Sequence, residues 1–294
     1  MYPFSYSKLD NQRDQELVSS ALEGNRKAVE ALIAKHQRWI YNIVLRMIWH
    51  PQDAEDICQD IIIKVLTHLS TFQSKSSFRT WLYRIVFNHI LNLKKSEFRY
   101  KEHSFEQYGT MIDRTPDLDL PDPTQVPVDL QVIIDEIKIS CMTGMLLCLD
   151  PQQRLVFILS CIFGMSHQYG SIILSITSTN YRQQLCRARR QLANFMDQKC
   201  GLIRSENPCH CAHKTQALIM MGYVDPLHLL FKKNVVQLVK DVITTKKRNF
   251  GTFIETRCVK LFREHPLSQS PDYIHKLKDV LDSPEFVNIF SVYN

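Results

Sequence analysis

Residues 53–95 read DAEDICQDIIIKVLTHLSTFQSKSSFRTWLYRIVFNHILNLKK, and this stretch decides the fold of the chain. Its first part repeats an apolar residue every four positions, at Ile57, Ile61, Val65 and Leu69. That spacing predicts one apolar face of an amphipathic helix. Polar residues at 70–77 predict a loop, and a second helical stretch rich in aromatic residues follows. We therefore expect two amphipathic helices joined by a short polar loop.

The polar faces of these two predicted helices differ in chemistry. The first begins with the acids Asp53, Glu55, Asp56 and Asp60, which suit the positive end of the helix dipole. The second interleaves aromatic rings with cations, and single-stranded nucleic acid needs that combination because rings stack on bases while cations hold phosphates. The alternative is a helical core whose rings only pack. Phe78, Leu82 and Ile85 share one face and are expected to pack in this way.

The runs DAEDICQDIIIKV and FQSKSSFRTWLYRIVFNHILN resemble region two of bacterial sigma factors, in the small extracytoplasmic-function group. The resemblance implies that the first helix docks on core RNA polymerase, through Asp53, Asp56, Gln59, Asp60 and Ile63. It also implies that the loop and second helix hold a flipped base and nearby phosphates of the downstream promoter element. The residues implied in this melting step are Phe72, Gln73, Ser74, Lys75, Phe78, Arg79, Trp81, Arg84, Asn88, Lys94 and Lys95.

Composition and charge agree with a globular nucleic-acid-binding protein. The 294 residues suffice for two domains, and 45% hydrophobic with 22% charged residues is ordinary for globular chains. The net charge of +6 permits nucleic-acid binding without proving it. Residues 79–101 and 182–204 each carry six Lys or Arg against one acid, whereas residues 113–136 carry seven acids against one Arg. The sequence thus alternates basic, acidic and basic segments.

The same composition indicates a cytoplasmic location. The 9 Cys are scattered through helical patterns, which predicts reduced thiols. No apolar run approaches the length of a membrane span, and the first ten residues lack the order of a signal peptide. We expect a soluble cytoplasmic protein without a membrane partner or a cofactor.

The predicted fold is all-α, with two helical domains. A region-two domain of three or four helices is expected at 10–98, and an acidic, proline-rich, extended linker at 99–130. In sigma factors this linker runs through the polymerase, and a solvated tether without contacts is the alternative. A helix-turn-helix domain is expected at 131–203, and a mostly helical C-terminal extension at 204–294.

The helix-turn-helix prediction rests on a short helix at 167–174, a turn at 175–177 and a longer helix to about residue 196. On the longer helix, Tyr181, Leu185, Ala188 and Leu192 fall on one side. This layout resembles sigma region four, which reads the upstream promoter element. The implied DNA contacts are Thr179, Asn180, Arg182, Gln183, Arg187 and Arg190.

The short helix and its turn depart from the family pattern. The family usually has Glu at the place of Tyr169 or Ile172, Gly at Ser175 and an acid at Thr179. A non-Gly residue with positive φ costs energy at such a turn. Two readings remain open: a helix-turn-helix that reads DNA weakly, and one kept only as a packing unit.

The C-terminal extension carries a second candidate site. Cys200, Cys209, Cys211 and His213 could supply four zinc ligands, but the tight Cys-x-Cys spacing favours free thiols, so we predict no metal. Residues 227–242 have an amphipathic pattern, and residues 272–290 resemble two short closing helices.

The function predicted from these residues is a sigma factor, not an enzyme, because no carboxylate pair, triad or phosphate loop stands out. Its partners would be core RNA polymerase and promoter DNA. An anti-sigma factor and a recruiting DNA-binding protein are two further candidate partners, and the sequence does not decide between them. A sigma factor brought to promoters by such a recruiting protein is one alternative. A stand-alone helix-turn-helix regulator that never touches polymerase is another.

Overall fold

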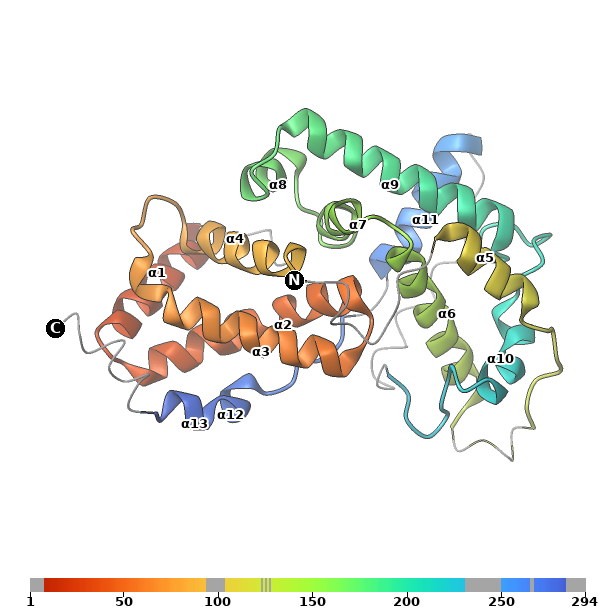
Figure 1. Ribbon diagram of the computed structural model, residues 1–294, viewed down its shortest axis with the longest axis horizontal. Helices are drawn as coiled ribbons and strands as arrows, with labels where there is room; N and C mark the ends of the chain where they lie inside the picture. Colours follow the sequence, from red (N-terminus) through yellow and green to blue (C-terminus); the bar gives the residue numbers. More distant parts are fainter. Residues whose placement is uncertain are drawn as a thin grey trace. The chain divides into compact units, whose positions relative to one another are not determined.

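A computed structural model of the chain describes residues 8–93, 104–122, 124, 126, 128–230, 250–264 and 267–283 (Figure 1). These residues form helices joined by turns, with one isolated β-bridge between Cys200 and Cys209, which confirms the all-α prediction. The chain divides into two compact units. Unit one holds residues 1–100, 165–178 and 269–294, and unit two holds residues 101–164 and 179–268. No described helix is both long and apolar enough to cross a bilayer.

Unit one is built around residues 53–93. Its described elements are α1 (Lys8–Leu22), α2 (Arg26–Ile48), α3 (Pro51–Thr67), the 3-10 turn η1 (Leu69–Thr71), α4 (Phe78–Leu91), α8 (His167–Ile173), α12 (Tyr273–Lys276) and α13 (Lys278–Leu281). Asn25 caps α2 by accepting a hydrogen bond from the Ala28 amide. Pro51 occupies the first turn of α3, where its missing N–H costs nothing.

The predicted apolar faces form the core of unit one. Ile57, Ile61, Val65 and Leu69 are all buried, which confirms the four-residue spacing as a core signal. From α4, Phe78 and Leu82 are buried against them, whereas Ile85 is only half-buried. These contacts fix α3 and α4 relative to α2.

A buried ion cluster joins three helices of unit one. Asp14 of α1 is fully buried and accepts from the Arg79 guanidinium of α4, itself only 8% exposed. From α2, Lys35 Nζ lies 2.6 Å and His36 Nε2 3.5 Å from Asp14 Oδ1. Burial alone would raise the pKa of Asp14, but hydrogen bonds from His36, Lys35 and Arg79 hold that pKa well below its ordinary value. The carboxylate is therefore charged and ties α1, α2 and α4 together.

Unit two contains α5 (Phe105–Arg114), α6 (Leu130–Leu147), α7 (Pro151–Phe157), the π-helical turn η3 (Ile158–Ile162), α9 (Ser178–Lys199), α10 (Cys211–Met220) and α11 (Phe250–Glu264). α7 begins at Pro151, with the Asp150 side chain capping it by accepting from the Gln152 amide. Gly164, with φ +72°, follows η3 and ends this helical segment.

The prediction of an extended linker at 99–130 is wrong over α5. Ser104 and Gln107 form a reciprocal capping box that starts this helix. Tyr108 is buried, donates a hydrogen bond to the Cys141 carbonyl at 3.1 Å, and lies 5.9 Å from the Phe195 ring. Gly144 of α6 leaves the room for this approach, since a Cβ there would lie 2.5 Å from the Tyr108 hydroxyl. Packing on α6 and α9 therefore stabilises this ten-residue helix, which would be marginal on its own.

The C-terminal extension contributes to both units. α11 belongs to unit two, while α12 and α13 belong to unit one and confirm the two short closing helices within the described residues. Of the predicted amphipathic segment 227–242, residues 231–242 lie outside the described residues, and residues 227–230 form no helix.

Replacing Asp14 by Asn tests the buried ion cluster. We expect a loss of about 3–5 kcal/mol in the free energy of unfolding at neutral pH, because Arg79 would remain buried without its countercharge. Since the folded-state pKa is lowered, Asp14 contributes stability above its unfolded pKa of about 3.9. That contribution is lost as the pH falls from there through the folded-state pKa.

Denaturant unfolding of the wild type and Asp14→Asn, at neutral pH and at steps below pH ~4, measures the difference. Glu16→Gln, an exposed acid on the same helix, serves as the control and should change little. A difference between wild type and Asp14→Asn that stays constant into acid would contradict the assignment.

Candidate nucleic-acid interface

The acidic face of α3 is presented to solvent. Asp56 and Asp60 are exposed, and Asp53, Gln59 and Ile63 are half-buried. Asp53 Oδ1 lies 3.5 Å from His50 Nδ1 in the first turn. All five candidate docking residues thus lie on one helix whose opposite face is core. A rigid helix with an acidic, accessible face can take part in a charge-complementary contact with a basic partner surface.

Three aromatic rings gather where the loop after η1 meets α4. The ring centroids of Phe72 and Phe78 lie 5.7 Å apart, those of Phe72 and Trp81 5.6 Å, and those of Phe78 and Trp81 5.6 Å. Phe78 is buried at 2% exposure, whereas Phe72 and Trp81 are half-buried. The buried ring therefore anchors two rings that keep part of their surface in solvent.

The backbone of the loop is also defined. Ser77 caps α4 by accepting from the Thr80 amide at 3.2 Å. Ser74 has φ +54°, the left-handed conformation that non-Gly residues rarely adopt. Gln73, Ser74 and Lys75 are exposed at the tip. The structure thus brings Phe72, Trp81 and the polar tip residues together on one short element.

The predicted cations of α4 lie in different surroundings. Arg79 is buried in the ion cluster with Asp14, a placement that the sequence pattern did not predict. Arg84 is exposed, and its guanidinium lies 3.5 Å from the Ile172 carbonyl. Asn88 is exposed on the same helix. Lys94 and Lys95 lie outside the described residues.

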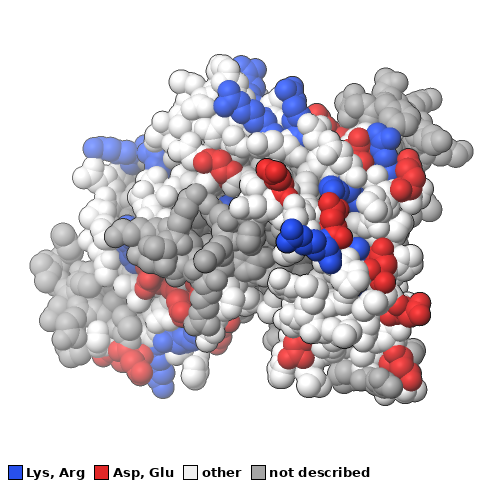
Figure 2. All heavy atoms as spheres, turned by 45° about the vertical axis from the view of Figure 1, so that its right-hand side comes forward, with Lys and Arg blue, Asp and Glu red and all other residues white. Residues whose placement is uncertain are grey.

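Helix α9 carries the second predicted interface, and its two faces separate as expected. Tyr181, Ala188 and Leu192 are buried, whereas Leu185 on the same predicted side is only half-buried. The Tyr181 hydroxyl lies 2.8 Å from Ser160 Oγ. The candidate DNA contacts are all exposed: Thr179, Asn180, Arg182, Gln183, Arg187 and Arg190. Figure 2 shows several Lys and Arg side chains close together along the upper edge of the view. Figure 1, whose view differs only by a turn about the vertical axis, draws α9 at the same level. This face can contact phosphates.

The turn before α9 has the conformation that the family pattern implies. Ser175 has φ +54°, so this chain places a side chain where a left-handed backbone favours glycine.

Tyr169 of α8 has contacts of its own within unit one. Its hydroxyl lies 2.9 Å from Thr80 Oγ1, and its ring stands edge-on to Tyr83 at 6.4 Å. Thr80 and Tyr83 are the α4 partners in these contacts, and neither belongs to the site residues predicted from the sequence.

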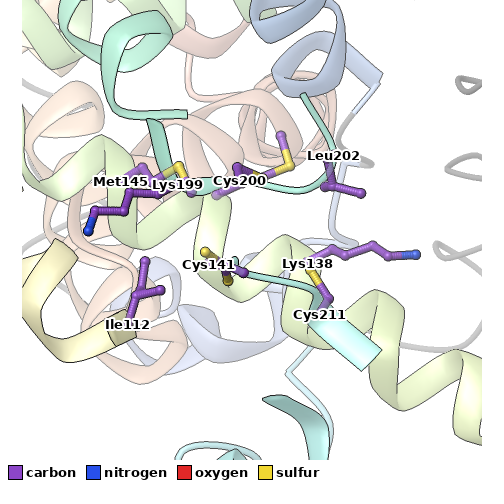
Figure 3. A pocket seen from close by; sticks show the side chains of 10 residues that line it. Ile112, Lys138, Cys141, Met145, Lys199, Cys200, Leu202 and Cys211 are labelled. Atoms are coloured by element: carbon purple, nitrogen blue, oxygen red, sulfur yellow. The ribbon is translucent and has the colours of Figure 1, made fainter. Parts of the chain in front are cut away.

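Four cysteines line a small cavity of about 20 Å³ in unit two (Figure 3). They are Cys141 of α6, Cys200 at the end of α9, and Cys209 and Cys211 before and at the start of α10. Cys141 therefore stands where the sequence proposed His213, which is exposed. All four are free thiols, and burial raises the pKa of Cys209 to about 11 and that of Cys211 to about 12. Among the described residues no group of three or more His, Cys, Asp or Glu is arranged to hold a metal ion.

Comparison with known proteins gives matches over both predicted interfaces. The family model "Sigma-70 region 2" matches residues 32–100, and "Sigma-70, region 4" matches residues 139–192. The chain is 26% identical to the RNA polymerase sigma factor NccH of Alcaligenes xylosoxydans xylosoxydans, over 64% of this chain and 96% of that protein. It is also 26% identical to the ECF RNA polymerase sigma factor SigE of Mycolicibacterium smegmatis, over 66% and 76%.

Two further matches are partial or distant. The chain is 36% identical to the RNA polymerase sigma-H factor of Pseudomonas aeruginosa, but over only 27% of this chain and 42% of that protein. Among solved structures, CnrH in complex with the cytosolic domain of CnrY is similar with a TM-score of 0.44 and 22% identity. That match covers 63% of this chain and 97% of CnrH.

Proposed function

Because the chain belongs to the sigma-70-like family, in its extracytoplasmic-function group, we propose that it directs core RNA polymerase to promoters and nucleates DNA opening there. The observation that carries this proposal is the juxtaposition of an acidic helix face and a partly exposed aromatic group on one rigid helical unit. A protein that only recognises double-stranded DNA needs neither feature.

The first step of the proposal is docking through α3. Asp56 and Asp60 are exposed and lie on the side of α3 opposite the buried Ile62 and Val65. In the polymerase complex these acids, with Asp53, Gln59 and Ile63, would meet the coiled coil of the largest subunit. The buried core behind α3 holds the face rigid, so little conformational entropy is lost on docking.

The second step is capture of an unpaired base. Phe72 and Trp81 each keep part of a ring in solvent, and the exposed Gln73, Ser74 and Lys75 surround them. A flipped base of the non-template strand could stack on these rings while Lys75 and Arg84 neutralise neighbouring phosphates. Phe78 and Arg79 would act without touching the base. Phe78 would support the Trp81 ring, and Arg79 would fix α4 to α1 through Asp14.

The third step is upstream-element binding by α9. Arg182, Arg187 and Arg190 are exposed and can hold phosphates, while Thr179, Asn180 and Gln183 lie near the start of the helix where base edges would be read. The left-handed Ser175 favours a second version of the proposal, in which this readout is weak and a partner protein recruits the factor. A stand-alone duplex regulator remains the competing function, and co-purification with core polymerase separates it from both.

Reversing one charge tests the docking step. Asp60→Arg should abolish detectable binding to core polymerase, because like charges brought together at an interface cost several kcal/mol. Helical content should stay unchanged, since the side chain is exposed. Core affinity and circular dichroism are measured together. Glu23→Arg, an exposed acid outside α3, is the control. Normal core binding by Asp60→Arg would rule out this docking face.

Removing one ring tests base capture. Phe72→Ala should lower open-complex formation with little effect on core affinity, because a stacked base contributes about 1–3 kcal/mol. Permanganate reactivity of thymines in the melted region measures opening. Tyr223→Ala removes an exposed ring in unit two and serves as the control. If thymine reactivity is unchanged in Phe72→Ala, the base does not stack on this ring.

A promoter scan tests the whole proposal and the strength of upstream readout. Core polymerase reconstituted with the chain should transcribe from a native promoter, and single-base substitutions should cost more in the downstream element than in the upstream one. Each good base contact discriminates by about 1–3 kcal/mol, so a weak reader gives a shallow profile. An equally steep loss at the upstream element, without any partner protein, would show normal reading by α9. No transcription without a partner would favour recruitment.

A further inference from the structure

The last helices among the described residues, α12 and α13, belong to unit one and pack on it. Tyr273 and Leu277 have no exposed surface, and Leu281 is only 3% exposed. These three residues follow a four-residue spacing over α12 and α13, so one side of the segment is fully covered. A surface tail without a docking place would leave such side chains in water. Residues 272–282 are therefore a docked segment, called here the clamp.

Polar contacts fix the clamp to α2 and α3. The Tyr273 amide donates to Gln37 Oε1 at 3.2 Å, and its hydroxyl donates to the Glu55 carbonyl at 3.4 Å. Asp272 caps α12 by accepting from the amides of Ile274 and His275. Two ion pairs complete the contact, between Lys276 and Glu55 and between Arg26 and Asp282. The contact combines apolar burial with specific pairing, so it has one defined register.

The clamp lies beside the proposed docking face. Glu55, which carries two clamp contacts, belongs to the same helix as the docking residues. At 3.6 residues per turn, Gln59 lies one turn further along and only about 40° around the helix axis from Glu55. Asp56 and Asp60 lie further round and stay exposed. A helical partner about 10–12 Å across that lay on these acids would reach over Glu55.

From this geometry, and resting on the proposed sigma function, we propose that residues 272–282 form an autoinhibitory clamp. It occupies the flank of the docking face on α3 and lowers the affinity of the chain for core RNA polymerase. Core polymerase and the clamp compete for the space around Glu55, so that docking requires the clamp to leave. A chain with a weakened clamp then binds core more tightly, because a larger fraction of molecules is competent to bind.

The test compares core affinity in the full chain and in two variants. Lys276→Glu turns the ion pair with Glu55 into a repulsion at an exposed site, with little risk to folding. Tyr273→Ala removes the buried anchor. Both should bind core polymerase about tenfold more tightly than the wild type. Lys278→Glu makes the same charge change at an exposed lysine of α13 and should bind like the wild type.

Two measurements report the state of the clamp itself. Cys58 is fully buried next to Tyr273, so its alkylation by a thiol reagent should be faster in Tyr273→Ala. Hydrogen exchange of the wild type should show the amides of Leu277 and Leu281 protected in the free chain and exposed in the core complex. A clamp that is only a structural support would stay protected in both.

Each result decides the matter. Tighter binding by both variants, with loss of amide protection on docking, supports the clamp. Equal or weaker binding by both variants overturns it while leaving the sigma function intact. Amides that remain protected in the core complex overturn it likewise. If neither the wild type nor any variant binds core polymerase, the proposed function fails, and the clamp fails with it.

Discussion

One buried charge holds the functional unit together. Asp14 gathers Arg79, Lys35 and His36 from two other helices inside unit one. A buried carboxylate without these partners would cost several kcal/mol, so α1, α2 and α4 can pack only in the register that satisfies it. α4 begins at Phe78, next to Arg79, and carries Trp81 in the same first turn. The ion cluster therefore also fixes where the aromatic group stands, and the proposed base capture would depend on it.

Periodicity in the sequence was enough to predict the long elements but not the partners of their polar residues. The four-residue spacing in α3 and the two-sided pattern of α9 are local, and the structure confirms both. Arg79 reads locally as one more cation on an aromatic helix, because its partner Asp14 lies 65 residues earlier in the chain. The burial of Arg79 depends on this distant partner, so no short segment of the sequence could predict it.

The prediction of short elements from the sequence failed for a related reason. α5 spans only ten residues inside a segment rich in proline and acids, so its composition indicated an extended chain. Its capping box was readable in the sequence, but the helix is held by Tyr108 against α6 and α9, contacts made far along the chain. Cys141 illustrates the same limit, since it lines one cavity with three cysteines that lie 59 to 70 residues later in the sequence. The positions of short helices and side-chain clusters are therefore determined by tertiary packing and not by the local sequence.

Contacts between α8 and α4 give a structural reason for one departure of α8 from the family pattern. Tyr169, at one of the two places where the family usually has an acid, bonds through its hydroxyl to Thr80 and meets Tyr83 edge-on. An acid at that position could accept from Thr80 but could not supply the ring contact, and burying its charge there would cost free energy. A second contact joins the two helices, since the Arg84 guanidinium of α4 lies 3.5 Å from the backbone carbonyl of Ile172 in α8. Of the two α8 positions that differ from the family, Tyr169 is thus used for packing on α4, whereas the Ile172 side chain is exposed. In the proposed function, sequence readout would then rest on the exposed face of α9 and on the aromatic group of unit one.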